Sequence, residues 1–190
     1  EALNKSIENG FKLIEIDLLE TKDKKFIGAN SWSKFKQDSS LQKNNVNDLP
    51  LNFDDFKKIK ILKKYTPLTT EIINSTFNKH KDLILVTDKS NNFKKINKDF
   101  KFNNRRIIVE IFGKKNFFKS IKQGIINPMY SATYKDYDFI INNKIRIISA
   151  HTGDIFKNRE IYRILSYNFF HNQQFSSIVI FFIYKKCFSQ

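Results

Sequence analysis

The chain has 190 residues and a formal net charge of +15, from 34 Lys and Arg against 19 Asp and Glu, with a pI of about 9.8. This length is typical of one domain with a buried core, and the single cysteine, Cys187, excludes a disulfide or a cysteine-based metal site within the chain. The basic residues are 29 Lys and only 5 Arg, and no zinc-finger spacing, RNP-like strand or Arg-rich arm accompanies them. The charge therefore indicates a solvated, lysine-rich surface and disfavours nucleic acid as a partner.

The first elements place two carboxylates close together. A helix is expected over Glu1 to Asn9, and a strand over Lys12 to Leu18. Because side chains alternate along a strand, Glu15 and Asp17 share one face while the intervening isoleucine points to the other. Two acids this close need a cation to offset them, and a hard divalent ion held by carboxylate oxygens is one such partner. The alternative is an exposed edge strand with solvated acids.

A turn and a long polar segment follow this strand. Thr21, Asp23 and Lys24 form the turn, which leads to a short apolar pair at Phe26 and Ile27. Asp38 to Tyr65 has few strand signals, so we expect a polar insertion near residues 38–65.

From there the pattern alternates between strands and helices. Beyond the first strand, β-branched and aromatic runs predict strands over Leu83–Thr87, Ile107–Phe112, Ile125–Tyr130, Lys144–Ser149 and Ser177–Tyr184. Helical spacing predicts helices over Thr69–His80, Lys114–Gln123, Lys135–Asn142 and Lys157–Tyr167. Such alternation predicts an α/β fold with a parallel sheet. The apolar run from Ile178 to Tyr184 is too short to span a bilayer and fits a buried strand.

Two later acids are candidates for chemistry. Asp88 and Lys89 end the strand Leu83–Thr87, at the kind of position where catalytic groups of a barrel collect; a helix-cap or turn role for Asp88 is the alternative. Glu110 lies inside an apolar strand, where an unpaired charge would cost several kcal/mol. It is either a metal ligand or the partner of Lys89, and a structural salt bridge is the favoured interpretation. His151, which follows the strand Lys144–Ser149, is interpreted as structural, as are the other histidines.

The residues from Glu1 to Trp32 resemble the glycerophosphodiester phosphodiesterase family, within the phosphatidylinositol phospholipase-like superfamily. That family has an EA-type helix, a Gly, an E-x-D strand, a T-x-D-G turn and an apolar strand that ends in His-Asp. The matching residues here are Glu1, Ala2, Gly10, Glu15, Asp17, Thr21 and Asp23, and then Asn30 and Ser31 at the His-Asp position. A looser match continues through Tyr65–Leu68 and Lys89.

The resemblance implies a site and a reaction. The reaction is metal-assisted hydrolysis of a phosphodiester such as a glycerophosphodiester, a small-molecule substrate of lipid metabolism. The implied residues are Glu15, Asp17 and Asp88 as ligands of a divalent metal ion (Ca or Mg), Lys89 as the catalytic cation and Glu110 as a substrate-binding residue. When the family pattern is aligned on Lys89, however, the family's third acidic ligand falls on Thr87, one position before Asp88.

The family's two acid–base histidines are both missing from the chain. The first belongs to an HRG-like motif that would lie upstream of residue 1, and the second is replaced by Asn30, whose amide exchanges no proton near neutral pH. The family fold is a (β/α)8 TIM-type barrel, which takes about 250 residues. We therefore expect residues 1–190 to form a single partial barrel domain, N-terminally incomplete and lacking its first strand.

Two functions stay open on the sequence. One is a phosphodiesterase, and the other is a catalytically inactive remnant or binding protein that keeps the metal and phosphate site. A basic nucleic-acid-binding domain is a third, less favoured reading. Cellular location and oligomeric state are not indicated by the sequence.

Overall fold

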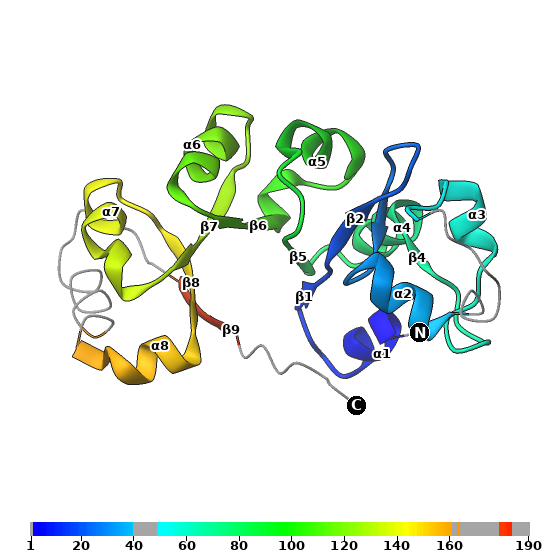
Figure 1. Ribbon diagram of the computed structural model, residues 1–190, viewed down its shortest axis with the longest axis horizontal. Coiled ribbons are helices and arrows are strands. Elements are labelled where there is room, and N and C mark those ends of the chain that lie inside the picture. Colours follow the sequence, from blue (N-terminus) through cyan, green and yellow to red (C-terminus); the bar gives the residue numbers. More distant parts are fainter. Residues whose placement is uncertain (1, 40–48, 161–162, 164–178, 184–190) are drawn as a thin grey trace. The chain divides into compact units, whose positions relative to one another are not determined.

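The computed structural model describes residues 2–39, 49–160, 163 and 179–183 (Figure 1). The helices are α1 (Ala2–Glu8), α2 (Trp32–Asp38), α3 (Phe53–Lys58), α4 (Thr70–Lys79), α5 (Phe93–Asp99), α6 (Lys114–Lys122), α7 (Tyr137–Asn142) and α8 (Thr152–Lys157), with short 3-10 helices η2 (Asn104–Arg106) and η3 (Tyr134–Asp136). The strands are β1 (Leu13–Glu15), β2 (Leu18–Glu20), β3 (Phe26–Gly28), β4 (Leu68–Thr69), β5 (Ile84–Thr87), β6 (Ile107–Phe112), β7 (Asn127–Ala132), β8 (Ile147–His151) and β9 (Val179–Ile183).

The main sheet follows the order of the chain. Its strand order is β1-β5-β6-β7-β8-β9, and the pairs β1–β5, β5–β6, β7–β8 and β8–β9 are parallel. Each new strand is added on the same side of the one before it, without the reversal that marks a doubly wound sheet. The predicted α/β class with a parallel sheet is therefore confirmed, and the winding is that of a partial TIM-type barrel.

The chain divides into two compact units. One comprises residues 1–109 with 123–126, and the other comprises 110–122 with 127–190. The boundary falls inside β6, between Val109 and Glu110.

The first unit contains a break that the sequence pattern did not predict. The expected strand Lys12–Leu18 is in fact two strands, because the chain leaves the main sheet after Ile16, whose N–H donates to the Val86 carbonyl at 2.9 Å. Asp17 then accepts a hydrogen bond from the Ala29 N–H at 3.0 Å, and β2 joins the antiparallel sheet β2-β3-β4. The predicted alternation of faces holds through the break: Ile14, Ile16 and Leu18 are buried, and Glu15 and Asp17 are not.

The polar insertion has an apolar core of its own. Helix α3 lies within the segment 38–65 and buries Phe53 and Phe56 against Ile27 and Phe35, with Trp32 packed on the same cluster. Neither α2 nor α3 was expected, because both segments are mostly polar. Each nevertheless carries two aromatic residues spaced three apart, Trp32 and Phe35 in α2 and Phe53 and Phe56 in α3.

In the second unit the predicted elements are shifted in register. Strand β7 begins two residues later than the apolar run suggested and β8 three residues later, because Ile125 and Ile145 are buried in the segments that precede them. Strand β9 lies within the expected range, and α7 within the expected helix. Most of the expected helix Lys157–Tyr167 lies outside the described residues, and α8 occupies 152–157 instead. Among the described residues, no helix combines the length and apolar character needed to cross a membrane.

Candidate metal and phosphate site

The site is built at the carboxyl ends of β1 and β5. In this parallel pair Glu15 lies opposite Val86, one residue before the end of β5 and two residues before Asp88. Asp88 follows directly after β5 and is 2% exposed. These two carboxylates come from segments far apart in the sequence, and the parallel register brings them together.

The end of β5 re-aims the side chain of Asp88. In a regular strand Thr87 and Asp88 would face opposite sides of the sheet, and the family pattern would place the acid on Thr87. Here β5 ends at Thr87, and Lys89 adopts a left-handed conformation with φ of 66°. The chain turns sharply after Asp88, whose carbonyl accepts a hydrogen bond from the Ser90 N–H at 2.9 Å. This turn allows a residue one position later than the family acid to supply a carboxylate.

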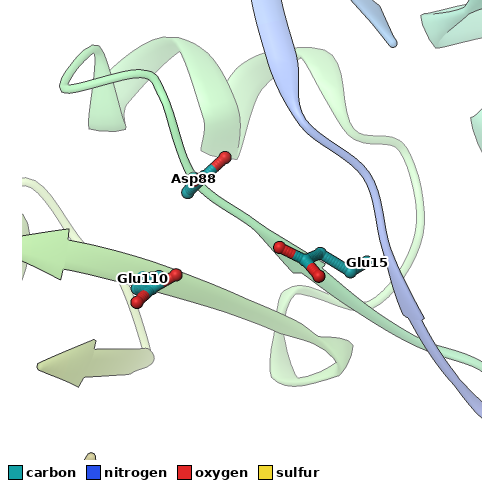
Figure 2. A group of neighbouring side chains, drawn as sticks. All are labelled: Glu15, Asp88 and Glu110. Atoms are coloured by element: carbon teal, nitrogen blue, oxygen red, sulfur yellow. The ribbon is translucent and has the colours of Figure 1, made fainter. Parts of the chain in front are cut away.

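Glu110 occupies the corresponding place on the next strand. The last paired residues of β5 and β6 are Thr87 and Val109, so Asp88 and Glu110 are the residues that follow across the sheet. Glu15, Asp88 and Glu110 each offer a carboxylate oxygen, and these oxygens lie within 4.8 Å of one another (Figure 2). Glu110 is 6% exposed, and its Oε1 accepts a hydrogen bond from the Ser149 hydroxyl at 2.7 Å. Its buried Oε2 has no hydrogen-bond partner within the described part of the chain.

Asp17 lies outside this trio and has different partners. Its Oδ2 accepts a hydrogen bond from the Asn30 side-chain amide at 2.7 Å, and its Oδ1 is 3.9 Å from the Lys89 ammonium. The same ammonium is 3.7 Å from Asp88 Oδ2. Lys89 therefore lies between the two acids, and Asn30 is held beside them at the position of the family's second histidine.

The residue after Asn30 has a structural role. Ser31 is the N-cap of α2, and its hydroxyl accepts a hydrogen bond from the Lys34 N–H at 3.1 Å. Serine is a favourable N-cap, so Ser31 stabilises the start of this helix.

An open cavity of about 270 Å³ adjoins the acids. Glu15, Asp17 and Asn30 line it, together with apolar and small residues that include Leu3 and Ser6 of α1, Gly28 of β3 and Leu68 of β4. A small polar ligand in this cavity would touch Glu15, Asp17 and the amide of Asn30.

Charge and geometry fit a divalent cation. Glu15, Asp17 and Asp88 carry three formal negative charges and Lys89 one positive charge, which leaves a formal charge of −2 on these four side chains. Two oxygens bound to one Ca²⁺ are at most about 5 Å apart, and two bound to one Mg²⁺ at most about 4.2 Å. The carboxylate oxygens of Glu15, Asp88 and Glu110, all within 4.8 Å of one another, form a group that could hold a metal ion, and the buried Oε2 of Glu110 belongs to it.

Sequence reasoning named four of the acids and Lys89 but missed Ser149. A serine in a buried parallel strand carries no signal of its partner, since the pairing with Glu110 depends on two strands that are 39 residues apart. His151 is the N-cap of α8, where its Nδ1 accepts a hydrogen bond from the Gly153 N–H at 3.1 Å, as its structural interpretation predicted.

Comparisons with known proteins support one fold. No protein-family model matches the sequence, and neither does any curated protein. The chain is similar to the crystal structure of a glycerophosphoryl diester phosphodiesterase from Parabacteroides distasonis ATCC 8503, with 16% identity and a TM-score of 0.58 over 80% of this chain and 57% of that one. A second glycerophosphodiester phosphodiesterase structure from the same organism matches with 12% identity and a TM-score of 0.61, over 87% of this chain and 71% of that one.

These features define the chain first as a TIM-barrel-like α/β protein with an acidic site at the carboxyl ends of its strands. More particularly, its fold is that of the glycerophosphodiester phosphodiesterases, as the resemblance of its sequence implied. The chain spans 57% of the length of the first of these structures.

Proposed function

We propose that this chain binds a divalent metal ion and a phosphodiester of the glycerophosphodiester class, and that its reaction is metal-assisted hydrolysis of that ester. The observation that carries the proposal is the convergence of Glu15 and Asp88 with Glu110 around one point, next to Lys89 and an open cavity. The fold shared with glycerophosphodiester phosphodiesterases supports the choice of substrate class. Residues 1–190 are proposed to be one partial (β/α)8 domain, with an insertion near 38–65.

We assign roles from the contacts. Glu15, Asp88 and Glu110 would hold the ion, and a bound divalent ion supplies polarisation of the phosphoryl oxygens. The ammonium of Lys89, already between two acids, would offset negative charge on the phosphate. Asp17 orients Asn30 and Lys89, and its part as a metal ligand stays a prediction.

The weak point of the site is proton transfer. Asn30 donates a hydrogen bond to Asp17 but cannot act as acid or base near neutral pH. General acid–base catalysis contributes about 10²–10⁴-fold per group, so we expect low turnover from the chain as it stands. The 2.7 Å bond that holds Asn30 in place also favours the second candidate, a binding protein that retains the metal and phosphate site.

Metal binding is the first test. Calorimetric titration with Ca²⁺ and with Mg²⁺ should show one site in the wild-type chain, weakened at least tenfold in Glu15→Gln and in Asp88→Asn. Glu8→Gln, an exposed acid at the end of α1, is the matched control and should bind like the wild type. Equal binding by the site variants and the control would refute the metal assignment.

The second test separates enzyme from binding protein. Hydrolysis of glycerophosphocholine is measured with Ca²⁺ for the wild type and for Asn30→His, which places an imidazole beside Asp17. A rise in turnover of about tenfold or more in Asn30→His supports the phosphodiesterase assignment. Metal-dependent binding of the ester without turnover in either protein supports the binding protein, and absence of both refutes the proposed function.

A further inference from the structure

Three exposed aromatic side chains follow three successive strands of the second unit. Phe112 is the last residue of β6 and is 49% exposed. Tyr134 comes two residues after β7 and is 39% exposed, and Phe156 lies in α8, directly after β8, and is 66% exposed. The strands are neighbours in the order β6-β7-β8, and β7 and β8 are parallel. The carboxyl ends of adjacent parallel strands lie at one edge of a sheet, and the contact of Lys114 with Asp136 places the end of β6 beside the segment after β7. These three aromatic residues therefore share an edge, which we call the aromatic rim.

Contacts between the three loops fix the rim. The Lys114 ammonium, two residues after Phe112, is 3.7 Å from Asp136 Oδ1 in η3. Asp136 also accepts hydrogen bonds from the Thr133 N–H and hydroxyl at 3.0 and 2.9 Å, which closes a capping box at the start of η3. The Tyr134 N–H donates to Asp154 Oδ2 in α8 at 2.9 Å. Polar contacts thus connect the segments after β6, β7 and β8, and these contacts hold the segments that carry the exposed rings in place.

Basic side chains accompany each ring. Lys115, Lys135, Lys157 and Arg159 are all exposed. The Lys135 ammonium lies 5.8 Å from the Tyr134 ring centroid, and the Arg159 guanidinium lies 5.3 Å from that of Phe156.

Three acids of these segments already have partners, and Asp138 in the first turn of α7 is a further acid of this unit. Asp136 and Asp154 accept the hydrogen bonds described above, and Glu160 pairs with Arg163 at 2.6 Å. The rim therefore presents apolar rings within a positive field.

We propose that the aromatic rim docks on the surface of an anionic lipid membrane. Rings that combine an apolar body with a nearby cation suit the interface between acyl chains and negative headgroups. Lysine, a strongly hydrated point charge, attracts a diffuse anionic surface without the bidentate geometry that arginine offers to individual phosphates. This charge complementarity favours a membrane over an apolar protein partner. The proposal stands apart from the metal site and does not depend on the chain being a phosphodiesterase.

Vesicle co-sedimentation tests the proposal with the whole chain. The probes are vesicles of phosphatidylcholine alone and vesicles with equal parts of phosphatidylcholine and phosphatidylserine, each in low and high salt. The wild type should bind the anionic vesicles, lose most of that binding in high salt, and bind the zwitterionic vesicles weakly. Failure to bind anionic vesicles, or equal binding to both kinds, would overturn the proposal.

Two sets of variants locate the surface. Combined Phe112→Ser, Tyr134→Ser and Phe156→Ser should reduce the partition coefficient about tenfold or more, and the backbone hydrogen bond of residue 134 is retained because it uses the N–H. Phe11→Ser, which removes a ring that is 60% exposed before β1, is the matched control and should bind like the wild type.

The charge set is Lys115→Gln, Lys135→Gln and Lys157→Gln. Each change should lower binding about fivefold, so the triple variant loses about two orders of magnitude. Circular dichroism and thermal unfolding establish that the variants fold. If either folded set of variants binds vesicles as the wild type does, the location of the surface is refuted. If the wild type binds no vesicles but forms a dimer that the aromatic variant abolishes, the rim is assigned to a second copy of the chain and the membrane proposal is overturned.

Discussion

Arg106 closes the turn between α4 and β5, the strand that leads to Asp88 and Lys89. Its Nη1 donates to the His80 and Leu83 carbonyls at 3.1 Å each, and its Nη2 donates to the Phe77 carbonyl at 2.9 Å. Its guanidinium carbon is 5.1 Å from the Phe102 ring centroid. The last carbonyls of a helix have no partner within the helix. The forked side chain supplies donors to the Phe77 and Leu83 carbonyls and a second donor to the His80 carbonyl, which also accepts from the Leu83 N–H at 3.3 Å.

The cost of removing this side chain follows from the contacts. Three hydrogen bonds at about 1 kcal/mol each, a cation–π contact of about 0.5 kcal/mol and the favourable charge at a helix C-terminus of about 0.5 kcal/mol give about 4 kcal/mol for Arg106→Met. Arg106→Lys keeps the charge but replaces the fork with a single ammonium, so about 2 kcal/mol is expected. At about 2–4 °C per kcal/mol for a chain of this length, the melting temperature should fall by about 8–16 °C and 4–8 °C.

Urea unfolding followed by circular dichroism measures these losses, and Arg105→Met, at the exposed neighbouring arginine, is the control and should cost less than about 0.5 kcal/mol. Hydrogen exchange of β5 amides should accelerate in Arg106→Met before global unfolding. A loss below 1 kcal/mol in Arg106→Met, or no difference between the lysine variant and the wild type, would show that water satisfies the three carbonyls equally well.

Three further predictions concern the cores and the rim. Burial raises the pKa of Asp136, but hydrogen bonds from Thr133 and Tyr130 and the charge of Lys114 outweigh it and hold the pKa below its ordinary value of 3.8. The resulting stabilisation is present above the unfolded pKa and is lost as pH falls through the folded pKa. Asp136→Asn should therefore cost about 1 kcal/mol of unfolding free energy in urea at pH 7 and progressively less as the pH is lowered below 3.8, and a pH-independent cost would contradict this. Burial first, and then the charge and hydrogen bond of Asp136, raise the pKa of Tyr130 to about 12. An ultraviolet titration of the tyrosines should therefore show a component at high pH that Tyr130→Phe removes, and ionisation of all tyrosines together near pH 10 would contradict this. Phe56→Ala empties a fully buried site and should cost about 3–5 kcal/mol of unfolding free energy; a loss under 1 kcal/mol would mean that the cluster collapses around the gap.

The local sequence pattern was sufficient to predict strands and buried faces wherever the burial of a segment follows from its own residues. The alternation Ile14, Glu15, Ile16, Asp17 predicted which side chains are buried even though the strand breaks, because each peptide unit of extended chain reverses the face. The runs at 84–87 and 107–112 predicted parallel strands because both of their faces are covered by apolar contacts. The polar segment 38–65 was interpreted as an insertion, but the aromatic pair Phe53 and Phe56 turns part of it into core.

The sequence by itself determined the class of fold and the types of residue at the site, since both depend on short-range periodicity and on side-chain chemistry. Tertiary structure decided which acids meet. Strand register places Glu110 beside Asp88, the left-handed turn at Lys89 aims Asp88, and the same turn brings the ammonium of Lys89 near Asp17. Each of these depends on strand pairing between distant segments, and one residue of register would reverse every face. For the same reason, only the fold could place Phe112, Tyr134 and Phe156 along one edge, because they are neighbours in the sheet and not in the chain.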